Sequence, residues 1–284
     1  MKLRYKIVNG ILLEYTDVAI PVAGPKDVVV QVKAAAANPL DYHFMRGSPY
    51  LMRLSSGIGR PDDPRMGADF AGIVSSVGDE VTRFAEGDRV FGGRNGAFAE
   101  FIVIPEDRAI AHLPDDVSFE AAAAIPIALG AEVHGVCSTP NVEMVLGLGA
   151  EHVFDYKKEN YTESDNQYDL IVDMVGSESL SANRRVLQPN GRMVLVGGPK
   201  GDWLAPFWPP LKAAVLSMFI DQEIGMMLAT LKGDDLEYLA GLMADGRLMS
   251  QIDRRFPLHE TPEALRYLET QRARGKVIVS AELQ

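Results

Sequence analysis

A small set of polar residues near the start of the sequence has side chains that could act on a carbonyl group. Asn38, Asp41 and Tyr42 follow Asp27–Lys33, a run rich in β-branched residues that predicts a strand. The Tyr42 hydroxyl could donate a hydrogen bond to a carbonyl oxygen that gains negative charge. Two structural alternatives stay open, because Tyr42 could be a half-buried tyrosine of a β-barrel and Asp41 could cap the helical turn after Pro39.

The composition restricts what else the chain could do. Of its 284 residues, 47% are hydrophobic and 24% are charged, which is the balance of an ordinary globular protein. The net charge of −11 argues against nucleic acid or an anionic membrane as the main partner. Cys137 is the single cysteine, which excludes an intrachain disulfide and a cysteine-based zinc site. The five histidines form no HxxxH pair, so we predict no metal site.

No targeting or membrane segment is expected. Glu14 and Asp17 interrupt the apolar residues that follow the basic N-terminus, so a signal peptide is not predicted. The most apolar run, Ala121–Ala131, is too short to span a bilayer. These features predict a cytoplasmic protein without a membrane partner.

The first part of the chain, up to about Pro114, predicts strands and turns. Short apolar runs separated by Gly, Asp and Pro occur at 27–33, 72–77, 89–91 and 99–104. Closely spaced short strands with glycine turns predict a small β-barrel or sandwich. The glycines of this stretch are interpreted as turn residues rather than as ligand contacts.

The pattern changes after Ser118, where predicted helices begin to alternate with strands. Strands are predicted at 133–137, 152–154, 169–175, 192–196 and 276–280, and helices at 141–148, 180–187, 234–245 and 261–270. The segment 169–175 is expected to be a buried strand because its residues are almost continuously apolar. Alternating strands and helices predict βαβ units and a parallel sheet.

Several short motifs occur in a fixed order along these elements. They are ANPLDY at 37–42, GADFAGIV at 67–74, GDRVFG at 87–92, DMVG at 173–176, GRMVLVG at 191–197 and ARGKV at 273–277. In this order they resemble the quinone-oxidoreductase branch of the medium-chain dehydrogenase/reductase superfamily. The resemblance implies an α/β fold with a GroES-like β-barrel domain at 1–118, completed by 254–284, and a truncated Rossmann-like doubly wound parallel sheet at 119–253.

The resemblance also bears on zinc. Zinc-dependent members of the superfamily use a cysteine, a His-Glu pair and a further cysteine or aspartate as ligands. The matching places here hold Pro39–Asp41 and Ala68–Asp69, with Ala68 at the position of the histidine. The chain therefore resembles the zinc-independent reductases.

One unit of the Rossmann-like domain is missing from the sequence. Dinucleotide binding in such domains begins with a strand, a G-x-G-x-x-G loop and a helix, and no glycine-rich segment here has that context. Ala123–Ala128 resembles the end of the linking segment, and Leu129–Ser138 resembles the end of the first helix and the second strand. We predict that roughly 30–40 residues are absent between Ala128 and Leu129. The chain would then lack its central strand and bind NADPH weakly or not at all.

The remaining residues indicate where a nicotinamide cofactor would lie. Ser138 and Thr139 end the second strand, where NAD-preferring domains usually carry an acidic residue, so these small side chains leave room for a 2′-phosphate. The resemblance implies NADPH, with Tyr156 and Lys157 near that phosphate. The alternative is that Ser138–Asn141 is an N-cap and helix start.

Three further positions are implied by the resemblance. Val175 and Gly176 end one strand and Gly197 and Gly198 end the next, where the family contacts the ribose and nicotinamide. The alternative is that both pairs form turns after the strands. Lys276 could reach the cofactor phosphates, or it could belong to a solvated basic cluster.

Taken together, the resemblance implies a reductase that passes hydride from NADPH to a quinone, an enone or another activated carbonyl compound. Asn38, Asp41 and Tyr42 would face this small-molecule substrate. The alternative is a catalytically inactive relative that acts as a binding or regulatory protein, because the cofactor loop is missing. The resemblance also implies a homodimer.

Overall fold

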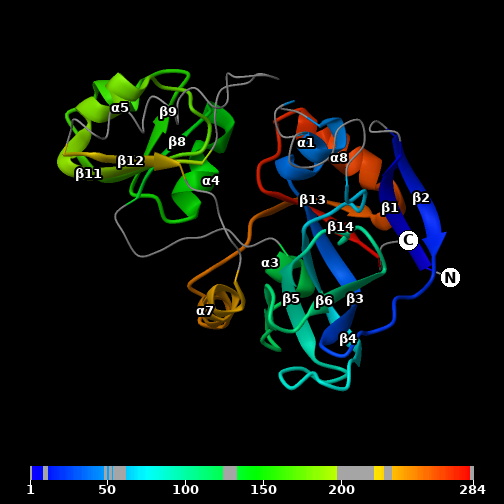
Figure 1. Ribbon diagram of the computed structural model, residues 1–284. Helices are drawn as coiled ribbons and strands as arrows, with labels where there is room; N and C mark the ends of the chain where they lie inside the picture. The colour runs from blue at the N-terminus through cyan, green and yellow to red at the C-terminus, as the bar shows by residue number, and fades with distance from the viewer. Residues whose placement is uncertain are drawn as a thin grey trace. The chain divides into compact units, whose positions relative to one another are not determined.

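The computed structural model describes residues 2–8, 12–47, 50, 53, 62–123, 133–196, 221–226 and 232–281 (Figure 1). Contacts divide the chain into two units. Unit 1 comprises Met1–Ser48, Met52–Ala128 and Thr230–Gln284, and unit 2 comprises Pro49–Leu51 and Leu129–Ala229.

Unit 1 contains a seven-stranded mixed sheet with the order β13-β14-β3-β4-β5-β7, and β6 also pairs with β3. The strands are β3 (Asp27–Ala37), β4 (Asp69–Val77), β5 (Arg89–Gly93), β6 (Phe101–Pro105), β7 (Ile110–His112), β13 (Ile252–Pro257) and β14 (Lys276–Ser280). A separate hairpin joins β1 (Lys2–Val8) to β2 (Leu12–Val18). Within the described residues the sheet is an open path from β13 to β7, so the predicted closed barrel is not present there. The expected α/β fold class is confirmed.

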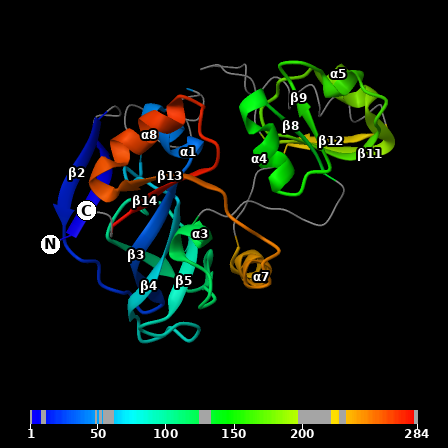
Figure 2. The ribbon, with the colours of Figure 1, turned by 180° about the vertical axis from the view of Figure 1, so that it is seen from behind.

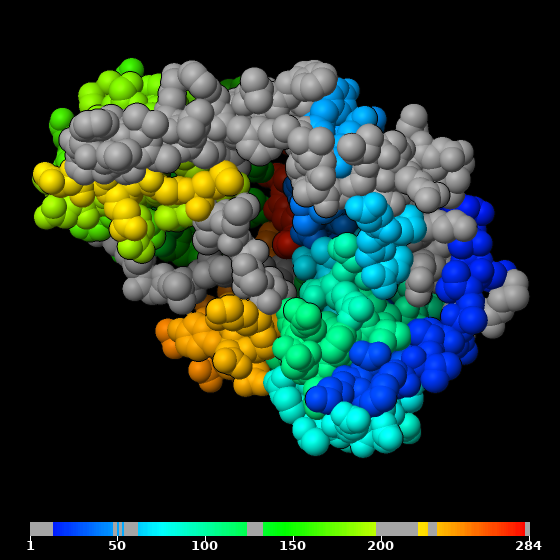
Figure 3. All heavy atoms as spheres, in the orientation of Figure 1, coloured from blue at the N-terminus to red at the C-terminus, as the bar shows by residue number. Residues whose placement is uncertain are grey.

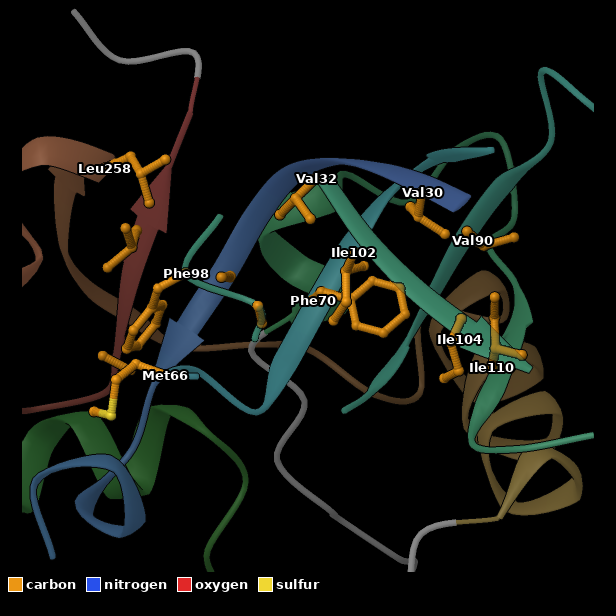
Figure 4. Packing of buried hydrophobic residues seen from close by; sticks show 14 of the residues in the cluster. Val30, Val32, Met66, Phe70, Val90, Phe98, Ile102, Ile104, Ile110 and Leu258 are labelled. Atoms are coloured by element: carbon orange, nitrogen blue, oxygen red, sulfur yellow. The ribbon is translucent and has the colours of Figure 1, made fainter. Parts of the chain in front are cut away.

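Two hydrophobic clusters cover the two faces of strand β3. Val28, Val30 and Val32 point into one cluster, and Ala34 and Ala36 point into the other. The change of face follows from a register shift between Val32 and Ala34 in the pairing of β3 with β4, because one extra residue reverses the alternation of side chains. Figure 4 shows the first cluster, in which the Phe70 ring lies beside Ile102 and the Phe98 ring lies beside Met66.

Four helices lie in the described part of unit 1. They are α1 (Pro39–Arg46), α3 (Phe119–Ala123), α7 (Gly233–Ala244) and α8 (Thr261–Glu269). Helix α8 buries Leu265 and Leu268 in the first cluster and lies beside α1, to which an Arg46–Glu269 ion pair joins it (Figure 2). Helices α3 and α7 bury apolar residues in the second cluster, and α7 packs against β7 (Figure 3).

Contacts assign α3 and α7 to unit 1, although the predicted cofactor domain at 119–253 includes both helices. The physical reason is burial: Ala122 of α3 and Leu236 and Ala240 of α7 belong to the same cluster as Phe91 of β5. The predicted domain boundaries stay a prediction. Local sequence pattern predicted these helices but not which sheet they would cover.

Two short parallel sheets lie in the part of unit 2 that the structure describes. In the first, β8 (His134–Cys137) pairs with β9 (His152–Asp155), and in the second the order is β10 (Tyr168–Asp173), β11 (Leu187–Leu195) and β12 (Glu223–Met226). The helices among the described residues of this unit are α4 (Val142–Gly147) and α5 (Leu180–Arg185), with the short 3₁₀ turns η2 (Thr139–Asn141) and η3 (Tyr161–Glu163). No ladder joins β8 to β10 among the residues that the structure describes. This arrangement agrees with a missing central strand, and the absence of that strand stays a prediction.

Strand β10 is less buried than its sequence predicted. Leu170 and Val172 are 53% and 51% exposed, and only Ile171 of the strand is buried. The prediction of a buried strand at 169–175 is therefore wrong. A strand of a doubly wound sheet is buried only when elements cover both faces, and no described element covers the face that carries Leu170 and Val172.

An aromatic cluster connects the two sheets of unit 2. The His134 Nδ1 atom lies 3.1 Å from the Tyr168 hydroxyl, and their rings meet edge to face with centroids 5.6 Å apart. His152 packs against His134, and Phe154 lies between His152 and Tyr161 in the same chain of rings. The side chains of β8 and of β10 therefore contact each other although their backbones do not pair.

We expect Tyr168→Phe to lower the free energy of unfolding of the chain by about 1 kcal/mol, because it removes the hydrogen bond to His134 and keeps the ring. Urea-induced unfolding followed by circular dichroism measures this effect. Tyr238→Phe is the matched control, since Tyr238 is 60% exposed. Equal stability of the two variants would show that the hydroxyl contact contributes nothing to the joining of the sheets.

Candidate functional site

The predicted substrate-facing residues lie at the start of helix α1. Asn38 is the N-cap residue, Pro39 opens the helix, and the Asn38 backbone N–H donates to Asp41 Oδ2 at 2.7 Å. Asp41 is only 5% exposed. The alternative in which Asp41 caps the turn after Pro39 is therefore what the structure shows, and a contact of Asp41 with substrate stays a prediction.

Three strand ends meet at this helix. Asn38 follows β3, Asp69 begins β4 and Lys276 begins β14. The Asn38 amide nitrogen donates to Asp69 Oδ2 at 3.0 Å, and the Lys276 ammonium donates to Asn38 Oδ1 at 2.9 Å. Lys276 Nζ also lies 3.9 Å from Asp69 Oδ2. We name Asn38, Asp69 and Lys276 the strand-end triad.

Burial shifts the acids of this region towards their protonated forms. The pKa of Asp41 is raised to about 7, mainly by burial and to a smaller extent by the nearby Asp69 carboxylate, while hydrogen bonds from the backbone of Asn38 and Gly67 oppose the rise. Burial also raises the pKa of Asp69, while Lys276 and the Asn38 amide oppose that rise. Asp41 therefore changes its charge near neutral pH.

Tyr42 is partly buried against the first hydrophobic cluster, with its ring centroid 4.5 Å from that of His43. This placement agrees with the alternative of a half-buried tyrosine. The geometry alone does not assign the Tyr42 hydroxyl to a substrate, so its role as a hydrogen-bond donor stays a prediction.

A small cavity lies beside Asp41. Its volume is about 20 Å³, which is room for about one water molecule. The Arg65 guanidinium borders it and is held by Asp63 through hydrogen bonds of 2.8 and 2.7 Å. Gly67 also lines it with a φ of +87°, and an added Cβ there would lie 2.5 Å from the Phe98 backbone nitrogen, so only glycine fits. This cavity is too small for an organic substrate.

The predicted cofactor residues of unit 2 gather at the carboxyl ends of β8 and β9. Ser138 directly follows β8, and the Tyr156 N–H donates to the Cys137 carbonyl at 3.0 Å, which places Tyr156 next to Ser138. The Lys157 ammonium lies 5.0 Å from the centre of the Tyr156 ring. Ser138 also begins the turn η2, so the alternative of a helix start holds for the backbone.

Asp155 was not predicted, although it organises this group. Its Oδ2 accepts the Thr139 hydroxyl at 2.7 Å, its Oδ1 accepts the Lys157 N–H at 3.0 Å, and the Lys158 ammonium lies 3.1 Å away. The hydrogen bond from Thr139 is the main cause that lowers the pKa of Asp155. Because the Thr139 proton is used, Thr139 offers a cofactor only acceptor lone pairs, and donors must come from Ser138 and Lys157. An acid at a strand end directly before Tyr156 was the available signal.

The next predicted contact is a turn. The Asp173 carboxylate accepts the N–H of Val175 at 3.1 Å and that of Gly176 at 2.7 Å, and Gly176 has a φ of +70°. The turn alternative therefore describes the backbone here. Gly197 and Gly198 lie outside the described residues, and so does the predicted junction between Ala128 and Leu129.

Two properties of the described part of the chain concern metal binding and membrane insertion. No group of three His, Cys, Asp or Glu side chains that could hold a metal ion occurs there. Among the helices described, none is both long and apolar enough to cross a membrane. Zinc independence therefore stays a prediction from the sequence.

Two protein-family models match the chain. A model described as an alcohol dehydrogenase GroES-like domain matches residues 24–115, and one described as a zinc-binding dehydrogenase matches residues 148–279. The first covers most of the strands of unit 1, and the second spans unit 2 from the end of α4 and continues through β13 and β14.

Relatives match over most of the chain. A zinc-type alcohol dehydrogenase-like protein of Schizosaccharomyces pombe is 29% identical over 91% of this chain and 88% of its own length. A 2-methylene-furan-3-one reductase of Solanum lycopersicum is 26% identical over 97% of this chain and 76% of its own length. The crystal structure of a Pseudomonas syringae pv. Tomato DC3000 quinone oxidoreductase aligns with a TM-score of 0.76 and 26% identity, covering 99% of this chain and 100% of that one.

Proposed function

This chain belongs to the medium-chain dehydrogenase/reductase superfamily, in its quinone-oxidoreductase-like branch, and is an oxidoreductase; from that premise we propose that it passes hydride from NADPH to a quinone, an enone or another activated carbonyl compound. When bound, NADPH supplies the hydride. The residues of the chain bind the cofactor, orient the substrate and stabilise the charge that develops on it.

The observation that carries the choice of NADPH is the group at the ends of β8 and β9. Ser138 stands where NAD-preferring domains usually carry an acid, and its hydroxyl can donate to a phosphate. Lys157 adds a positive charge beside Tyr156. The carboxylate of Asp155 is directed at Thr139 and neutralised by Lys158, so it does not oppose a 2′-phosphate as a free acid would. These residues fit the adenosine end of NADPH.

Zinc independence is part of the same proposal. Ala68 borders the cavity beside Asp41 and has no group that could bind a metal ion. The Lys276 ammonium donates to Asn38 Oδ1 and lies 3.9 Å from Asp69 Oδ2, so a positive charge already stands beside this acid. A homodimer and a cytoplasmic location remain proposals from the sequence.

The second candidate is a catalytically inactive relative that binds other molecules. The alignment with the Schizosaccharomyces pombe protein runs over 321 positions and includes 91% of this chain, which is about 258 of its 284 residues, so about 63 of those positions have no counterpart here. These positions are enough to include the absent strand, glycine loop and helix. Separate sheets in the described part of unit 2 favour the same conclusion.

The test is NADPH oxidation by protein of verified 31.0 kDa mass, with millimolar NADPH and a panel of small quinones and enones. We expect slow oxidation that requires both the protein and the acceptor. Lys157→Met should lower the rate with NADPH about tenfold and leave the rate with NADH unchanged, because an ion pair to the 2′-phosphate is worth roughly 1–2 kcal/mol.

Lys157→Arg is the control for this variant, since it keeps the charge and should keep the preference for NADPH. Absence of any acceptor-dependent oxidation with either cofactor would instead support the inactive relative. Oxidation with an equal loss for NADPH and NADH in Lys157→Met would support the enzyme and contradict the assignment of the phosphate site.

A further inference from the structure

The Lys276 side chain is held in one place by unit 1 alone. In the sheet, Val277 of β14 pairs with Ala37 of β3, so Lys276 lies beside Asn38. Asp69 of β4 pairs with Ala36 on the other side of β3. A lysine side chain normally samples many rotamers. Here the contacts with Asn38 and Asp69 restrict the Lys276 side chain in the folded protein, so a ligand would not have to order it again.

The Lys276 ammonium still has donor capacity for a ligand. It carries three N–H groups, and Asn38 Oδ1 accepts one of them at 2.9 Å. Asp69 Oδ2, at 3.9 Å, is beyond hydrogen-bond distance and contributes charge rather than a second bond. The Lys276 side chain is 31% exposed, so part of it is open to solvent.

The other polar groups of this region are less suited to meet a negative oxygen. Asp41 is buried and accepts the N–H of Asn38, so its carboxylate faces the backbone. The Tyr42 ring packs into the first hydrophobic cluster. The Asn38 amide nitrogen donates to Asp69 and to the Ala36 carbonyl at 3.2 Å, so both of its protons are used. Lys276 is the cation of this group.

We propose that Lys276 is the group that stabilises the negative charge on the carbonyl oxygen of the substrate, and that Asn38 and Asp69 position its ammonium for this task. This inference rests on the proposed function. It replaces the expectation that Lys276 binds the cofactor phosphates or belongs to a solvated basic cluster.

The reduction needs only NADPH, the substrate and a proton from water. Hydride adds to the carbon at the far end of the conjugated system, and the π electron pair moves onto the carbonyl oxygen, which becomes an enolate or a phenolate. The Lys276 ammonium donates a hydrogen bond to this oxygen and offsets its charge. A proton from water then completes the reduction, and NADPH leaves as NADP⁺. Lys276 keeps its own proton throughout, so it acts by its charge.

The test uses 4-nitrophenol, whose anion resembles the oxygen-centred charge and changes the absorption spectrum on ionisation. Its binding needs no cofactor and no turnover. We expect the wild-type chain to bind 4-nitrophenolate about tenfold more tightly than Lys276→Met does, with equal affinity of the two for the neutral phenol. Lys276→Arg should retain at least half of the preference for the anion, because it keeps a charged donor at the same position.

Lys26→Met is the matched control for a general change of charge. Lys26 belongs to unit 1 and forms an ion pair of the same 3.9 Å length, with Glu80, away from the strand-end triad. It should bind 4-nitrophenolate as the wild type does. Thermal unfolding of all variants separates loss of the site from loss of the fold, and Lys276→Arg keeps the inference testable if Lys276→Met does not fold.

The outcomes separate this inference from the proposed function. Failure of the wild type to prefer the anion, or an unchanged preference in Lys276→Met, would overturn the role of Lys276 even if the chain reduces quinones. A lysine-dependent preference for the anion in a chain that oxidises no NADPH would support the role of Lys276 and refute the proposed function.

Discussion

NADPH is expected to bind this chain with a dissociation constant weaker than about 1 mM. The pyrophosphate of a dinucleotide is normally held by backbone N–H groups of a glycine-rich loop at a helix N-terminus. The residues that remain, Ser138 and Lys157, address only the 2′-phosphate. Isothermal calorimetry on protein of verified 31.0 kDa mass measures the constant. A submillimolar value would refute the prediction that the loop is required and absent.

Insertion of a complete strand, G-x-G-x-x-G loop and helix between Ala128 and Leu129 should raise the affinity for NADPH about 100-fold. Two charge-assisted hydrogen bonds to phosphate, each worth roughly 1.5 kcal/mol, already supply this factor. The matched control carries the same insertion with the three glycines changed to valine, which allows a strand and helix but blocks close approach of the backbone. Equal affinity of both insertions would show that the loop does not act through phosphate contact.

Asp41 should make the wild-type chain less stable as the pH rises from about 4 to about 7. Its pKa is about 7 in the folded chain, whereas the pKa of a free aspartate side chain is 3.8. Between these values the folded chain binds more protons than the unfolded chain, so a rise in pH favours unfolding. Ionisation of the buried Asp41 carboxyl should therefore lower the free energy of unfolding by about 4 kcal/mol between about pH 4 and about pH 7.

The variant Asp41→Asn isolates this contribution, because its side chain stays neutral and can still accept the N–H of Asn38. Its free energy of unfolding relative to the wild type should rise by about 2 to 4 kcal/mol between about pH 4 and about pH 8. Asp116→Asn, at an exposed position of unit 1, is the control and should show no such change. Urea titrations at several pH values measure both. Parallel pH profiles for wild type and Asp41→Asn would contradict a raised pKa of Asp41.

Much of the architecture follows from local sequence pattern. The β-branched run Asp27–Lys33 lies within β3, and the predicted helix at 261–270 corresponds to α8. The parallel strands of unit 2 also occur near their predicted positions. In these segments the pattern of apolar residues and the helix-forming residues agree with the final packing, so sequence suffices.

The differences arise where burial depends on distant parts of the chain. Leu170 and Val172 are apolar, so the sequence predicts that they are buried. In the structure no described element covers the face of β10 that carries them. Helix α7 gives no local sign that it belongs to unit 1 rather than to unit 2. The open sheet likewise reflects pairing between remote strands.

The sequence predicted the candidate site only in part, because some of its contacts also join distant parts of the chain. Asn38 and Ser138 stand at strand ends, which local sequence can identify. The partners of Lys276, and the contact of Thr139 with Asp155, depend on which strands lie side by side. In the strand-end triad, Lys276 and Asn38 are 238 positions apart in the sequence, so the residues around one do not predict its contact with the other.

Strand β3 has one consequence for how unit 1 unfolds. Beyond the register shift after Val32, Ala34 and Ala36 point into the second hydrophobic cluster while Ala35 and Ala37 point into the first, as the valines before the shift do, so neither cluster can lose β3 without exposing the other. The N- and C-terminal parts of the chain also meet on this strand through β14. The two clusters are therefore thermodynamically coupled, and unit 1 behaves as one cooperative folding unit although its chain is interrupted by the whole of unit 2.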